Sequence, residues 1–140
     1  EMPDTVAFVE HNEFKLFMRS FVCLIALQVS FGWCLPIIVL DVCSIKNRFK
    51  GVIMAACTID GAGQLVLLAF ATCGIENSDS WAWFLEHLHI NVVEISDSNR
   101  PVTVLSNREK GLHNALIAQF PNVHHCFCMK HIEKNIKSKL

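Results

Sequence analysis

A run of twenty residues without a charged side chain, residues 21–40, limits what this chain can fold into more than any other feature. The run is long enough to cross a bilayer as one helix, and Lys15 and Arg19 precede it as they would on a cytoplasmic flank. The same residues could instead be divided among buried elements of a globular core. Division is favoured by four residues that interrupt the run: Gln28, Ser30, Gly32 and Pro36. We therefore predict a globular domain, with a membrane span over residues 21–40 as an alternative.

The first 35 residues are predicted to hold a helix and a lead-in to the core. Asn12 is suited to cap a helix, and apolar residues follow on one helical face at Phe14, Phe17 and Phe21. The β-branched run over residues 37–41 follows Pro36 and predicts a buried strand. We therefore divide the chain into an N-terminal segment, residues 1–35, and a core, residues 36–140.

Composition narrows the class of protein further. The chain has 140 residues, of which 52% are hydrophobic and 18% charged, so it can bury a single core and is not disordered. A formal net charge of −1 provides no overall attraction to nucleic acid. Seven cysteines without a framework spacing predict free thiols in a reducing compartment. Four of them are expected to be buried: Cys23, Cys34, Cys57 and Cys73.

Predicted strands and helices follow one another through the core. Strands are predicted over residues 37–41, 51–59, 64–72, 101–105 and 123–127, with a hairpin turn at residues 60–63. Helices are predicted over residues 77–88, 108–120 and 130–140. Because buried strands that follow helices imply parallel neighbours, this order predicts a mixed α/β sheet with helices on both faces.

Two polar residues at strand ends are the first candidates for chemistry. Asp41 ends an apolar strand, and Asn107 follows the strand predicted over residues 101–105. Sites in α/β sheets lie at the carboxyl ends of parallel strands, where Asp41 and Asn107 could share a divalent metal. The alternative is that Asp41 starts a turn and that Asn107 caps the helix that follows it.

A second candidate site is rich in histidine and cysteine. Cys128 and His131 are three residues apart, so both could face one metal ion from the first turn of a helix. A structural zinc site needs four ligands, and residues 124–131 lack a standard paired spacing.

A set of basic residues could form a phosphate-binding face, or could be an ordinary solvated surface. They are Lys46, Arg48, Lys50, Arg108 and Lys110.

Taken together, the motifs resemble the transposase domain of Mutator-like elements (MULE), a family of plant transposases and transposase-derived proteins. The resemblance begins at residues 17–41 and continues through KNRFKG at 46–51, AACTID at 55–60 and LAF at 68–70. It extends through ENSDSWAWFL at 76–85, LSNREKGL at 105–112, FP at 120–121 and the Cys128, His131, Asn135 spacing. These segments cover nearly the whole chain in the order that the family has.

The resemblance implies a ribonuclease H-like fold and DNA cleavage by an Asp, Asp, Glu triad that binds Mg²⁺ or Mn²⁺. Asp41 matches the first acid, whereas Asn107 stands where the family has the second. The third acid would follow the Cys-x-x-His element, beyond the end of this sequence. Cys128 and His131 match that element, for which zinc is a candidate ligand. Val42 replaces a glycine of the family pattern, and a proline expected near Leu67 is missing.

From these features we expect a degenerate, C-terminally truncated transposase core that has lost catalysis but associates with DNA in the nucleus, with self-association as a further expectation. One alternative is a domain that is active in metal-dependent strand transfer when missing sequence completes it. The membrane protein with a span at residues 21–40 is the other.

Overall fold

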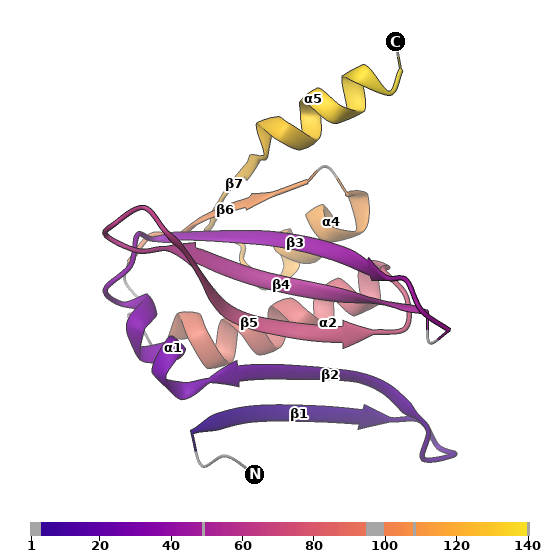
Figure 1. The fold of residues 1–140 in the computed structure, drawn as a ribbon. Helices are drawn as coiled ribbons and strands as arrows, with labels where there is room; N and C mark the ends of the chain where they lie inside the picture. Colours follow the sequence, from indigo (N-terminus) through magenta and orange to yellow (C-terminus); the bar gives the residue numbers. More distant parts are fainter. Residues whose placement is uncertain (1–3, 49, 95–99, 108, 140) are drawn as a thin grey trace.

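The computed structural model describes residues 4–48, 50–94, 100–107 and 109–139, apart from the side chains of Lys110, His131, Ile132 and Asn135 (Figure 1). It contains a seven-stranded sheet with the order β1-β2-β5-β4-β3-β6-β7. The strands are β1 (Thr5–His11), β2 (Phe17–Leu24), β3 (Ile37–Ile45), β4 (Gly51–Ile59), β5 (Leu65–Cys73), β6 (Thr103–Ser106) and β7 (His124–Phe127). The first five pair antiparallel, whereas β3–β6 and β6–β7 are parallel. The prediction of a mixed α/β sheet is therefore confirmed.

The helices lie between the strands and after them. They are α1 (Ile25–Phe31), α2 (Ser78–Leu88), which continues into the π-helical turn η1 (His89–Val93), α4 (Lys110–Gln119) and α5 (Met129–Lys137). Asn77 caps α2, because its side-chain oxygen accepts a hydrogen bond from Ser80 N at 2.8 Å. In Figure 1, α5 projects away from the sheet at its β7 edge.

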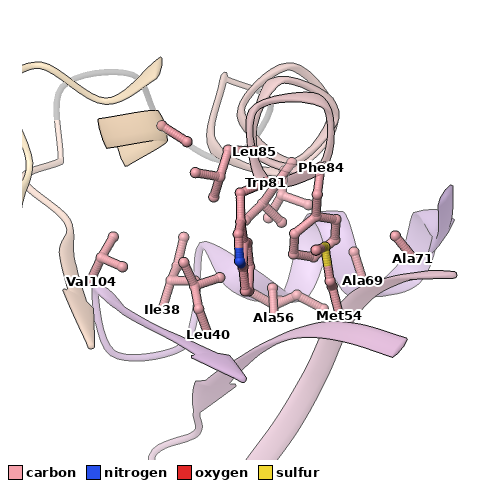
Figure 2. Packing of buried hydrophobic residues seen from close by; sticks show 14 of the residues in the cluster. Ile38, Leu40, Met54, Ala56, Ala69, Ala71, Trp81, Phe84, Leu85 and Val104 are labelled. Carbon is pink, nitrogen blue, oxygen red and sulfur yellow. The ribbon is translucent and has the colours of Figure 1, made fainter. Parts of the chain in front are cut away.

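The core lies between the sheet and α2. Figure 2 shows Trp81, Phe84 and Leu85 of α2 pointing onto the side chains of the central strands. On β4, Met54 and Ala56 face the helix and are fully buried. Their burial alternates with that of half-buried neighbours, which is the two-residue period of a strand, and β4 has the bounds that were predicted.

The turn between β4 and β5 is the predicted hairpin. Asp60 Oδ1 accepts hydrogen bonds from Ala62 N and Gln64 N, both at 2.9 Å. Gly63 has a positive φ of 79°, a conformation that favours glycine. Asp60 therefore has a turn-forming role.

The predicted N-terminal helix is wrong. Asn12 caps no helix, because its Oδ1 accepts hydrogen bonds from Phe14 N and Leu16 N within the tight turn between β1 and β2. Phe21 and Cys23 are buried on one face of β2 and alternate with less buried residues. The apolar residues that suggested a helix belong to the strand β2 and the turn before it.

One further expectation, helices on both faces of the sheet, fails, and so does the alternative of one membrane-spanning helix. Among the described residues, the long helices α2 and α4 contact each other and lie on the same face of the sheet, so helices do not cover both faces in this part of the chain. The opposite face keeps Ile53, Ala55 and Cys57 half-buried. Residues 21–40 form no single helix, since they contribute to β2, α1 and β3. No helix of the described part of the chain is long and apolar enough to span a membrane.

Candidate functional site on β3 and after β6

The strand predicted over residues 37–41 continues to Ile45, so Asp41 lies within β3 and does not end it, whereas Asn107 directly follows β6. The parallel pairing of β3 with β6 places these two residues on neighbouring parts of the sheet. Val39 lies opposite Leu105, so the register continued by two residues along each strand leads to Asp41 and Asn107. Side chains two residues apart on a strand share a face, which here is the face opposite α2. The strand pairing is therefore compatible with the predicted nearness of Asp41 and Asn107, whereas their role as a site stays a prediction.

Asp41 is exposed on the face of the sheet opposite α2. Its Oδ1 accepts a hydrogen bond from Val42 N at 2.9 Å, and Ala55 of β4 lies opposite it in the register. Burial, aided by the Asp41 charge, raises the pKa of the Cys57 thiol on the neighbouring strand. Asp41 therefore presents a carboxylate to solvent from a strand in the middle of the sheet.

Asn107 has a local structural role as well. Its Oδ1 accepts a hydrogen bond from Glu109 N at 3.1 Å, and its carbonyl oxygen accepts one from Ser106 Oγ at 2.9 Å. The side chain thus orders the chain between β6 and α4, close to the capping role that was the alternative to metal binding. An amide oxygen used in this way carries no charge to offset a cation.

The next strand adds a thiol to the same row. Leu105 lies opposite Cys126, so the register leads from Asn107 to Cys128, whose backbone N donates to Ser106 O at 2.8 Å. Cys128 is half-buried at the start of α5. Asp41, Asn107 and Cys128 therefore follow one another across three adjacent strands.

The donors in this row do not fit a pair of Mg²⁺ or Mn²⁺ ions. They comprise one carboxylate, one amide and one thiol, whereas hard cations require several charged oxygen ligands. Within the described residues, no group of three or more His, Cys, Asp or Glu side chains is arranged to hold a metal ion.

The structure describes only some of the residues that were predicted to bind zinc or DNA. Lys46, Arg48 and Lys50 are exposed between β3 and β4, on the segment that follows Asp41. Arg108 and the side chains of Lys110 and His131 lie outside the described residues, so the Cys128–His131 pair stays a prediction.

Sequence reasoning missed a histidine pair on the α2 face of the sheet. His125 Nε2 lies 2.6 Å from Ser106 Oγ, and His125 Nδ1 lies 3.2 Å from His113 Nδ1 on α4. Burial, together with the nearby His113, lowers the pKa of His125. Alternation along β7 could have assigned His125 to a face, but no spacing pairs it with His113.

A mixed sheet whose helices α2 and α4 pack on one face, with one candidate site residue within β3 and another directly after the parallel strand β6, is consistent with the ribonuclease H-like class of domains. A family model for the MULE transposase domain matches residues 37–135, from the start of β3 into α5. The chain belongs to the MULE transposase domain family. A search of curated proteins found no match to this chain.

Proposed function

We propose that this chain is a degenerate MULE transposase core that associates with DNA in the nucleus but does not cut it. The observation that carries the proposal is a neutral Asn107 directly after β6, the parallel partner of the strand that contains Asp41. In the resemblance to the family, Asn107 stands at the position of the second acid. Transposases of this kind use divalent metals, and two cations need several carboxylates to offset their mutual repulsion. A neutral amide that already accepts a backbone hydrogen bond provides no such offset.

Two features support DNA association. Family membership implies DNA as the partner, and exposed Lys46 and Lys50 flank the connection between β3 and β4. Lysines at such positions can neutralise phosphates without reading sequence. Because the net charge of the whole chain is −1, binding would rest on this local basic segment.

A nicking assay tests the loss of catalysis. The purified chain, incubated with supercoiled plasmid and Mg²⁺ or Mn²⁺, is expected to leave the plasmid intact. Asn107→Asp is expected to leave it intact as well, because one restored carboxylate does not complete the ligand set. Nicking by the wild-type chain that Asp41→Ala abolishes would overturn the proposal and favour an active strand-transfer domain.

The second arm of the test measures DNA binding against salt concentration. The affinity is expected to fall as salt rises, because phosphate contacts release counterions. Lys46→Gln and Lys50→Gln should each lower the salt slope by about 1, whereas Lys15→Gln, in the turn between β1 and β2, should leave it unchanged. An affinity that is independent of salt would contradict phosphate binding.

A further inference from the structure

The pair of histidines between α4 and β7 lies apart from the row that contains Asp41. His125 aligns with buried Val104 of β6 and so faces the helices, whereas Asp41 faces the other way. His113 comes from α4 and is exposed. The two imidazoles stack with a ring-centroid distance of 5.4 Å and an interplanar angle of 26°.

Ser106 connects this pair to the end of β6. Its hydroxyl has one proton, and it lies 2.9 Å from the carbonyl oxygen of Asn107 and 2.6 Å from His125 Nε2. In the tautomer in which Ser106 donates to Asn107, Ser106 Oγ accepts from His125 Nε2–H and Nδ1 of neutral His125 is an acceptor. His113 then donates from its own Nδ1 to His125 Nδ1.

The separation of these nitrogens matches that of two ligands on one metal ion. Nitrogens bound about 2.0–2.1 Å from a tetrahedral Zn²⁺ lie about 3.3 Å apart. The two Nδ1 atoms are 3.2 Å apart, within hydrogen-bond distance of each other. The Ser106 hydroxyl, which holds His125 Nε2–H, is the kind of outer partner that orients a ligating imidazole.

Space for the remaining ligands lies beside the pair. Both histidines line a cavity of about 70 Å³ whose other walls include Leu116, Phe120 and Val123. A buried water needs roughly 10–15 Å³ of such space, so the cavity can hold metal-bound water. His113 is open to solvent, which gives an ion a path of entry.

We propose that His113 and His125 form a binding site for a borderline divalent transition-metal ion such as Zn²⁺ or Co²⁺, with water as the other ligands. Imidazole is a favoured ligand for these ions. When the ion binds, the proton on His113 Nδ1 moves through solvent to His113 Nε2, so both rings stay neutral and no net proton is released. A bound ion would link α4 to β7. This proposed metal site does not depend on the proposed function.

Co²⁺ titration of the full chain, followed by its visible absorption, tests this site. Exposed thiols, including Cys43 and Cys126, are first alkylated so that they do not bind the ion. One Co²⁺ per chain is expected, with a spectrum that lacks thiolate charge transfer. His113→Gln and His125→Gln should each weaken binding by about tenfold or more.

The controls separate this pair from its neighbours. His124→Gln removes the adjacent histidine on the opposite face of β7, and Cys128→Ser removes the family cysteine; both are expected to retain binding. Absence of binding at millimolar Co²⁺, binding that survives His113→Gln, or binding lost in Cys128→Ser would each overturn the proposal. Because His113 is exposed, His113→Gln is expected to keep the circular dichroism spectrum of the wild type.

Discussion

At the scale of single residues, His87 shows how packing changes the chemistry of a side chain. It stacks on Phe8 and Phe21, with ring centroids at 4.5 and 5.3 Å, and meets the edge of Trp83 at 4.6 Å. Burial lowers the pKa of His87; nearby Arg19 also lowers it, whereas Glu86 and Glu10 act in the opposite direction. The folded chain therefore holds this imidazole in its neutral form.

That lowered pKa predicts a loss of stability in mild acid. An unfolded histidine titrates near about pH 6.5, so the unfolded chain binds a proton before the folded chain does as the pH falls. The contribution of His87 is present above about pH 6.5 and is lost as the pH falls towards its lower folded pKa. We expect the urea midpoint to fall from about pH 7.5 to about pH 5.5, and to fall less in His87→Phe, which keeps an aromatic ring. Equal falls would show that His87 contributes nothing to the change.

The site residues differ in how far sequence could predict them. The prediction that Asp41 ends its strand is wrong, because pairing with β4 extends β3 to Ile45. Only the position of Asn107 after an apolar strand was predictable. The contact of His113 with His125 was not, since it depends on how α4 packs against β7. The hydrogen bond from Glu109 N to Asn107 likewise needs the local backbone path.

At the scale of elements, Arg19 shows how contacts with distant segments hold the β1–β2 hairpin that stands in place of the predicted helix. The register places Arg19 on the same face of β2 as buried Phe21, where a charge breaks the expected alternation. Its guanidinium contacts Glu10 at 2.6 Å and Asp79 at 3.0 Å and lies 4.7 Å from the ring centroid of Trp83. These contacts connect β1 and β2 to α2, which no sequence period could show. Strand β4, whose interior carries no charge, was predicted at its observed bounds.

Removal of Arg19 is therefore expected to loosen the hairpin. The Arg19 side chain is only 13% exposed, so Arg19→Met should lower the free energy of unfolding in urea by about 1–3 kcal/mol. The matched control is Lys137→Met, which breaks the exposed ion pair with Glu133 on α5 and should cost no more than about 0.5 kcal/mol. Similar losses in the two variants would mean that Arg19 contributes no more than a surface charge.

At the scale of the whole molecule, the two faces of the sheet have different surroundings. On β4, Met54 and Thr58 face the helices and are fully buried, whereas Ile53 and Cys57 on the other face are half-buried. Exposed apolar surface of this kind promotes association and lowers solubility. The apolar residues of this chain therefore lie partly in a closed core and partly on a sheet face that is half open to solvent.

Adjacent lysine substitutions on β4 test this difference in a single strand. Met54→Lys would place an unpaired charge against Trp81 and Phe84. Burial of that charge should lower the free energy of unfolding by several kcal/mol. Because the total stability of a domain is about 5–15 kcal/mol, much of the protein should then unfold. Ile53→Lys can extend its ammonium group to water along the open face, so it should cost about 1 kcal/mol or less and raise solubility. Urea unfolding and the saturation concentration of each variant measure both effects. If Ile53→Lys destabilises the chain as much as Met54→Lys, the face is covered in solution, and sedimentation of the wild-type chain would then show whether a second copy covers it.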